Sequence, residues 1–160
     1  MKQSAGLLVY KRDGGRLLVF LVHPGGPFWA GKDAGAWSIP KGEPDGGEAG
    51  LAAARREFEE ETGQQIDGEF VALTPVRQPG GKIVRAWAVA GEIDADHIES
   101  NTCEIVWPPR SGRRIMIPEV DRAAWFTLEE AHTRVNKAQV PLLDELAQRT
   151  GGNLSPTDGD

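Results

Sequence analysis

Short runs of apolar residues, separated by turn sequences, predict several β-strands along the chain. Residues 5–10 and 17–22 form two such runs, and the Asp-Gly-Gly sequence at 13–15 between them is a strong turn signal. We therefore expect a β-hairpin in the first part of the chain. Further strands are predicted from the apolar runs at residues 69–74, 82–92 and 122–126.

Residues 48–62 follow helical rather than strand periodicity. Leu51, Ala54 and Phe58 lie three or four positions apart, and most residues between them are strong helix formers. Gly63 follows as a typical helix stop. This pattern predicts a long helix with one apolar face turned toward the core.

Strands and helices are interleaved along the rest of the chain. Two shorter helices are predicted, one starting at residues 128–132 and one over 140–149. This order favours an α/β fold in which a mixed sheet packs between helices. We expect residues 1–149 to form a single domain. Residues 150–160, mostly Gly, Ser, Pro and Asp, are expected to form a disordered tail.

Composition narrows the classes of function. The chain has 160 residues and a net charge of −6. This acidic balance argues against stable binding of nucleic acids, because nucleic-acid binders generally carry a basic face. Cys103 is the only cysteine, so no intramolecular disulfide can form. No apolar run is long enough for a signal peptide or a membrane span, and we expect a soluble cytoplasmic protein.

A cluster of acidic residues stands out in the predicted long helix. Glu57, Glu60 and Glu61 share one helical face, whereas Glu59 points away from it. The three carboxylates repel one another, and their place near the helix C-terminus makes the arrangement less favourable still. A divalent cation would offset this repulsion, and carboxylates suit Mg²⁺ or Mn²⁺. Helical spacing alone also permits a solvated acidic face.

The spacing around this cluster resembles the Nudix box, which is Gly, five residues, Glu, seven residues, then Arg-Glu-apolar-any-Glu-Glu-any-Gly-apolar. The seven fixed positions match at Gly42, Glu48, Arg56, Glu57, Glu60, Glu61 and Gly63. Phe58 stands where an aliphatic residue is usual, and Gln64 where an apolar residue is expected. These two departures concern packing and leave the acidic positions intact.

The resemblance extends beyond the box on both sides. Residues 37–42, Trp-Ser-Ile-Pro-Lys-Gly, are similar to the segment that precedes the box in Nudix enzymes, among them diadenosine polyphosphate hydrolases. Residues 118–131 resemble a late segment of the family, in which a Glu precedes a Trp-containing strand end and a helix. The resemblance therefore covers residues 5–132, and its motifs are closest to the diadenosine polyphosphate and nucleoside triphosphate pyrophosphohydrolases.

The resemblance implies an α/β/α sandwich and a metal-dependent hydrolase. Such an enzyme cleaves a phosphoanhydride bond by attack of water at phosphorus, with Mg²⁺ or alternatively Mn²⁺. The expected substrate is a small nucleotide, either a dinucleoside polyphosphate or a nucleoside triphosphate. A non-catalytic nucleotide-binding Nudix module, or an enzyme for ADP-ribose, NADH or capped RNA, remains open. The oligomeric state, monomer or homodimer, also remains open.

The resemblance assigns roles to individual residues. Arg56 would orient the carboxylates, and Glu48 would support it. Glu119 is expected to complete the metal site or act as the base, with Glu104 as the rival candidate. The remaining metal ligands would be Glu57, Glu60, Glu61 and the carbonyl of Gly42.

Substrate contacts are expected at Trp37, Lys41 and Arg85. Possible stacking platforms for a base are the aromatic residues Phe28, Trp29, Trp87 and Trp107. Two of them, Phe28 and Trp29, lie in the Gly- and Pro-rich loop 24–36, where they either line a pocket or close the edge of the core. The basic segment 107–114 either meets phosphates or a base, or is a solvated loop.

Overall fold

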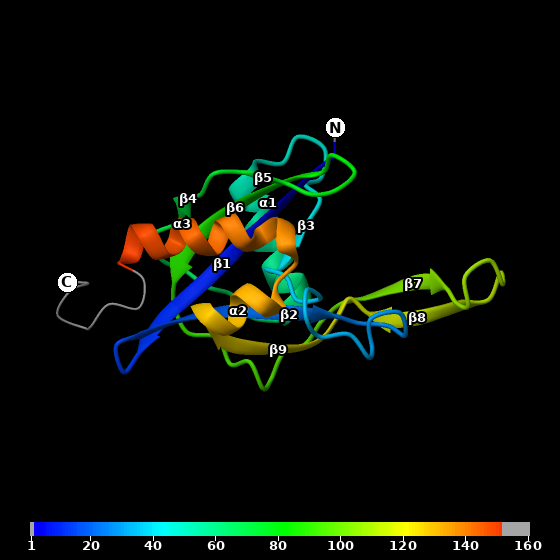
Figure 1. The fold of residues 1–160 in the computed structure, drawn as a ribbon. Helices are drawn as coiled ribbons and strands as arrows, with labels where there is room; N and C mark the ends of the chain where they lie inside the picture. Colours follow the sequence, from blue (N-terminus) through cyan, green and yellow to red (C-terminus); the bar gives the residue numbers. More distant parts are fainter. Residues whose placement is uncertain (1, 152–160) are drawn as a thin grey trace.

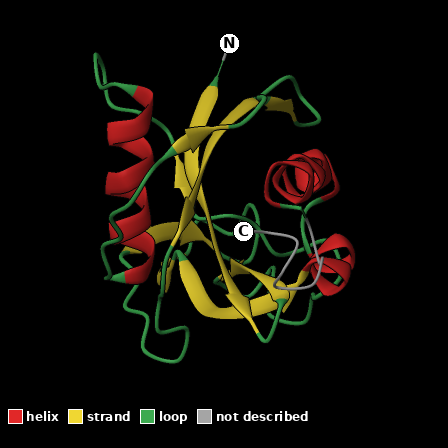
Figure 2. Ribbon diagram, turned by 90° about the vertical axis from the view of Figure 1, so that its left-hand side faces the viewer, coloured by secondary structure: helices red, strands yellow, loops and turns green. Residues whose placement is uncertain are grey.

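A seven-stranded mixed sheet forms the centre of the molecule in the computed structural model, which describes residues 2–151. Helix α1 (Gly50–Thr62) covers one face of the sheet. Helices α2 (Leu128–Arg134) and α3 (Val140–Thr150) cover the other face, as Figure 2 shows. The predicted α/β/α sandwich is thereby confirmed.

The central strands of the sheet run in the order β4-β6-β1-β2-β9, with β3 paired to β1 and β5 to β6 (Figure 1). Strand β1 is parallel to β6 and antiparallel to β2, which makes the sheet mixed. The bounds are β1 Gln3–Asp13, β2 Arg16–Pro24, β3 Lys41–Gly42, β4 Val71–Ala72, β5 Val76–Arg77, β6 Ile83–Ala90 and β9 Val120–Thr127.

The predicted N-terminal hairpin is present as β1 and β2. Asp13 pairs with Arg16, so the turn has only two residues, Gly14 and Gly15. Both have positive φ, at 62° and 84°. This turn type matches the twist of the strands it joins, and it needs residues that tolerate a left-handed backbone.

Burial on both faces of the sheet divides the core into two layers. Leu7 and Val9 of β1 pack on the α1 side, in one cluster with Phe58 of α1. Leu8, between them in sequence, packs on the opposite side with Leu142 of α3. The alternation follows from strand geometry, because successive side chains point to opposite faces.

Helix α1 begins at Gly50, two residues later than expected. Glu48 stays outside the helix, where its carboxylate accepts a hydrogen bond from the backbone N–H of Asp45. The helix ends as predicted. Gly63 has φ 74°, and its N–H donates to the carbonyl of Glu59. Ala54 and Phe58 are fully buried, which confirms the predicted apolar face.

The main difference from the sequence prediction is a second hairpin. Strands β7 (Thr102–Val106) and β8 (Arg114–Pro118) pair with each other in a separate two-stranded sheet. In Figure 1 this hairpin extends away from the rest of the molecule. The sequence predicted only a basic loop here, because each strand is five residues long and mixes polar with apolar side chains.

The other boundaries differ slightly. The predicted strand 69–74 pairs only at Val71–Ala72, and a further short strand follows at Val76–Arg77. Helix α3 continues through Thr150, one residue into the predicted tail, and the rest of that prediction, from 152 on, lies outside the described residues. None of the helices between residues 2 and 151 is long and apolar enough to cross a membrane.

Candidate active site

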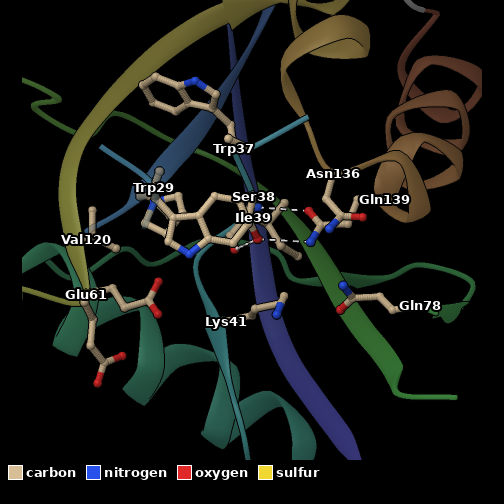
Figure 3. A pocket seen from close by; sticks show the side chains of 14 residues that line it. Trp29, Trp37, Ser38, Ile39, Lys41, Glu61, Gln78, Val120, Asn136 and Gln139 are labelled. Carbon is tan, nitrogen blue, oxygen red and sulfur yellow. Dashed lines mark hydrogen bonds between the residues drawn. The ribbon is translucent and has the colours of Figure 1, made fainter. Parts of the chain in front are cut away.

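A pocket of about 260 Å³ lies where the loop before β3 approaches the C-terminal part of α1 (Figure 3). One end, here called the acidic end, carries Glu61 of α1 and Glu119, which lies between β8 and β9. The other, the amide end, carries three amide side chains from loops and a short 3-10 helix, namely Gln78, Asn136 and Gln139.

Arg56 holds three glutamates by direct hydrogen bonds. Its Nη1 donates to Glu57 at 3.0 Å and to Glu60 at 2.9 Å. Its Nε and Nη2 each donate to one oxygen of Glu48 at 3.0 Å. These bonds, first those to Glu48 and Glu60, raise the pKa of Arg56 above its ordinary value. A planar guanidinium can make such paired contacts, and they fix the carboxylates in direction as well as in place.

Glu57 lies against Gly42, and the fit leaves no space for a side chain at position 42. A Cβ atom there would lie 2.0 Å from the carboxyl carbon of Glu57. The backbone of Gly42 pairs with Ala5 of β1, so the sheet holds the glycine against the carboxylate. Burial raises the pKa of Glu57, and the neighbouring Arg56 opposes this shift.

Glu61 is only 8% exposed. Its burial, then the charges of Glu119 and Glu57, raise its pKa to about 8. Lys41 opposes this shift, both by its charge and through a hydrogen bond from its backbone. Burial thus makes the charged form of Glu61 costly, and the adjacent carboxylates add to the cost.

The acidic end fits a hard divalent cation by charge and by ligand chemistry. Its donors are carboxylate oxygens, which Mg²⁺ and Mn²⁺ prefer. A cation there would offset the repulsion that raises the pKa of Glu61. Between residues 2 and 151 no three His, Cys, Asp or Glu side chains converge on a single metal position. The donor atoms of the acidic end therefore suit a divalent cation, although they do not surround a single position as a complete set of ligands.

Glu119 and Glu104, the two rival late acids, lie in different places. Glu119 lines the pocket, and its carboxylate accepts a hydrogen bond from Asn101 Nδ2 at 3.1 Å. Backbone bonds also link Asn101 to the carbonyl of Glu60 and to the N–H of Glu119. Glu104 lies on β7 and pairs with Arg114 at 2.8 Å. This geometry favours Glu119 over Glu104 as the late acidic residue of the site.

Lys41 and Trp37, two of the predicted substrate contacts, line the pocket. In Figure 3 the side chain of Lys41 lies between the acidic end and the amide end. Burial, and next the charge of Lys82, lower the pKa of Lys41, whereas Glu61 opposes the shift. Trp37 is 3% exposed, and its Nε1 donates to Asp33. Its ring is chiefly part of the core.

Arg85, the third predicted substrate contact, does not reach the pocket. It alternates along β6 with Val84 and Ala86, which face the α2 and α3 side. The guanidinium of Arg85 lies instead over the ring of Trp87, on the α1 side of the sheet. The expectation of a substrate contact at Arg85 therefore has no support from its position, because strand alternation turns it away.

The four aromatic residues considered as stacking platforms for a base lie in different parts of the molecule. Trp29 lines the pocket and packs against the core, so both earlier interpretations of it hold. Phe28 beside it is 52% exposed. Trp87 lies against the first turn of α1, where a Cβ added at Gly50 would meet its ring. Trp107 follows β7 in the protruding hairpin.

The amide end was not predicted from the sequence. Gln139 is 1% exposed, and its Oε1 accepts from the backbone N–H of Ile39 at 3.0 Å. Its Nε2 donates to Ser38 Oγ at 3.0 Å (Figure 3). Gln78 Oε1 is buried and accepts no hydrogen bond from the described residues. These glutamines lie outside any motif, so no signal in the sequence marked them.

Comparison with known proteins agrees with this geometry. The family model of the NUDIX domain matches residues 1–146. An RNA pyrophosphohydrolase of Erythrobacter litoralis (strain HTCC2594) is 41% identical over 75 residues, which are 46% of this chain and 42% of that protein. The chain thus spans less than half of that relative's length.

Two solved structures share the fold. A binary complex of Ap4A hydrolase from C. elegans has a TM-score of 0.66 and 20% identity, covering 94% of this chain and 98% of that one. The NUDIX domain of Shewanella oneidensis NrtR, solved with ADP ribose, has a TM-score of 0.65 and 15% identity, covering 93% and 88%.

Fold and site together define an α/β/α sandwich protein whose long helix brings Glu61 to one end of a pocket and carries, next to it, glutamates bound by Arg56. The match of the family model over residues 1–146 makes the assignment specific. The chain belongs to the Nudix family.

Proposed function

We propose that this chain is a metal-dependent Nudix pyrophosphohydrolase that cleaves a phosphoanhydride bond of a nucleoside polyphosphate. The observation that carries the proposal is the acidic end, where the buried carboxylates of Glu57 and Glu61 and the half-buried carboxylate of Glu119 repel one another beside Lys41. Such a cluster is costly for folding and suits a site for a cation and a polyphosphate. The names of two similar proteins, an RNA pyrophosphohydrolase and an Ap4A hydrolase, agree with this class of reaction.

Divalent metal ions are generally used by the family. In this chain the ligands would be Glu57, Glu60, Glu61 and Glu119, with the carbonyl of Gly42. A bound Mg²⁺ or Mn²⁺ neutralises phosphate charge and lowers the pKa of water.

The chain's own residues perform the other tasks of the reaction. Arg56 keeps the carboxylates in place by its hydrogen bonds to Glu48, Glu57 and Glu60. Glu61 or Glu119 accepts the proton of the attacking water, because both lie at the end of the pocket that carries the carboxylates. Lys41 contacts the phosphates between the two ends.

The amide end suits the nucleoside part of the substrate. Asn136 Oδ1 accepts from Ala138, which leaves its Nδ2 without a partner among residues 2–151. Gln78 Oε1 likewise accepts no hydrogen bond. Trp29 adds an aromatic ring to the same pocket. Unused hydrogen-bonding groups in a pocket that also holds an aromatic ring favour a base or a ribose there, and the phosphates would then extend past Lys41 toward the acidic end.

A hydrolysis screen with Mg²⁺ and Mn²⁺ tests the proposal. It should include nucleoside triphosphates, dinucleoside polyphosphates, ADP-ribose and NADH, with ¹⁸O-labelled water to locate the attacked phosphorus. We expect turnover of a dinucleoside polyphosphate or a triphosphate. E61Q should lower kcat/KM by at least about 100-fold, because it removes a charged ligand. E59Q is the matched control, since Glu59 is exposed and points away from the pocket.

Inactivity of the folded wild-type protein toward every substrate would contradict the proposal. In that case tight binding of ADP-ribose or a dinucleoside polyphosphate would identify a non-catalytic nucleotide-binding module instead. Wild-type turnover by E61Q would contradict the assignment of the metal ligands.

A further inference from the structure

The β7–β8 hairpin, residues 102–118 and here called the arm, contacts the rest of the molecule mainly at its root. A Cβ atom added at Gly25 would lie 2.1 Å from the carbonyl oxygen of Pro118. One added at Gly26 would lie 2.7 Å from Ile117. Beyond this root the two strands pair only with each other, and Figure 1 shows the arm projecting outward. The arm leads directly into Glu119 of the acidic end.

The charge of the arm is opposite to that of the whole chain. It carries three arginines and one glutamate, a net charge of +2, whereas the chain has −6. Arg114 pairs with Glu104 on the neighbouring strand. Arg110 and Arg113 are exposed at the tip and form no ion pair with any residue between 2 and 151. Arg110 also has φ 64°, a left-handed backbone rare outside glycine.

An aromatic ring accompanies these arginines. Trp107 is half-buried at the start of the tip, where its backbone N–H donates to the carbonyl of Arg113. Exposed guanidinium groups and an aromatic residue in the same hairpin tip suit single-stranded nucleic acid, which offers phosphates and stacked bases. A protein partner fits less well. One face of a two-stranded ribbon of five-residue strands measures only about 10 by 17 Å, far below the ~800 Å² per partner of a stable interface.

The two ends of the pocket and the root of the arm follow one another in an order that would bring part of a long substrate close to the arm. The amide end comes first, then Lys41, then the acidic end, and then the root of the arm beside Glu119. A substrate that places its first nucleoside at the amide end and its phosphates at the acidic end would lead its other half toward the arm. This step rests on the proposed function.

We propose that the arm binds a single-stranded RNA that is joined to the far side of the polyphosphate. The contact is weak and sensitive to salt, because Arg110 and Arg113 supply only two free cations and the rest of the chain is acidic. Several nucleotides are needed to run along the ~17 Å of the paired strands.

The test compares two substrates with the same phosphoanhydride bonds. One is diadenosine tetraphosphate, and the other is a ten-nucleotide RNA whose 5′ end carries adenosine through the same tetraphosphate. We expect kcat/KM to be about 10-fold higher for the RNA, and the ratio to approach one for R110S/R113S. The salt dependence of kcat/KM on RNA should become shallower by a log–log slope of about 1.4, roughly 0.7 for each lost phosphate contact. A two-nucleotide RNA should show no preference.

R16S/R149S is the matched control, because it removes the same charge from exposed positions at the start of β2 and in the last turn of α3, which are not part of the arm. The control should keep the wild-type preference for RNA. A second readout, independent of turnover, is the anisotropy of the labelled ten-nucleotide RNA with the E61Q protein. Adding R110S/R113S to E61Q should weaken that binding about 10-fold.

The outcomes separate this inference from the proposed function. Equal kcat/KM on both substrates, with RNA binding unchanged by R110S/R113S, would overturn the role of the arm while hydrolysis still stood. Arm-dependent RNA binding without hydrolysis of either substrate would support the arm and overturn the proposed reaction. A concentration-dependent dimer that is lost in R110S/R113S, with no preference for RNA, would overturn the inference in favour of a second copy of the chain.

Discussion

Three hydrogen-bonded glutamates around Arg56 show how much of the site is decided by single residues. The guanidinium reaches Glu48, Glu57 and Glu60 from one position on α1. Spacing in the sequence predicted that the glutamates converge, because helical geometry places residues three and four apart on one face. It could not predict that Gly42 would lie in contact with Glu57, since that contact joins a strand to a helix.

Gly42→Ala tests this contact. The added methyl group would lie 2.0 Å from the carboxyl carbon of Glu57, so the carboxylate must move. We expect metal-dependent kcat/KM to fall by about 100-fold and stability to fall by about 1–3 kcal/mol. Turnover as a function of Mg²⁺ concentration and chemical denaturation measure the two effects. Gly46→Ala is the control, because a Cβ atom there meets nothing within 4 Å. Equal behaviour of both variants would refute the steric argument.

Elements carrying a long periodic pattern could be predicted, and those held by distant contacts could not. Helix α1 was predicted to within two residues, because its apolar face and its stop signal are local. The arm was missed, since five-residue strands carry little pattern of their own. The amide end was missed for another reason. Gln139 reaches the backbone of Ile39, one hundred positions away in sequence.

Gln139→Ala should show that this distant contact holds the pocket wall. It would leave the buried N–H of Ile39 without its acceptor, a loss that costs about 1–3 kcal/mol of stability. We expect KM to rise more than kcat falls, because the wall that precedes Lys41 loosens while the carboxylates stay in place. Gln65→Ala is the control, since Gln65 is exposed and, among residues 2–151, its side chain bonds only to Glu59. A stability loss no larger than the control's would contradict this role.

At the scale of the whole molecule, an acidic chain folds around a sheet that has one apolar layer on each face. The sheet needs helices on both faces, and the interleaved order of elements predicted that architecture. The class of molecule that binds in the pocket is harder to predict from the sequence, because the pocket is built from loops before β3, after β5 and after α2. Its amide end, formed by Gln78, Asn136 and Gln139, lies outside the segments in which the sequence carries a motif of the family.

Stability of the metal-free protein should depend on pH through Glu61. Its folded pKa of about 8 lies above the ordinary value of 4.5, so folding favours the protonated form. The associated stability is fully present below pH 4.5 and is lost as the pH rises through 8. At 1.4 kcal/mol per pKa unit, the loss is at most about 5 kcal/mol.

Denaturant unfolding in EDTA measures this effect at pH 5 and pH 8. Wild type should lose clearly more stability between the two pH values than E61Q, which has no carboxyl group to titrate. Adding excess Mg²⁺ at pH 8 should raise the stability of the wild-type protein again. Identical pH profiles for the two proteins would show that Glu61 titrates normally.

Asn101 gives the arm a mechanical connection to the carboxylates. Its backbone N–H donates to the carbonyl of Glu60, and its side chain donates to the carboxylate of Glu119. The same residue lies directly before β7. Asn101 therefore ties the base of the arm to the backbone of α1 and to the side chain of Glu119. The residue from which the arm begins is thus also the residue that holds Glu119, so the arm and the acidic end share one structural support.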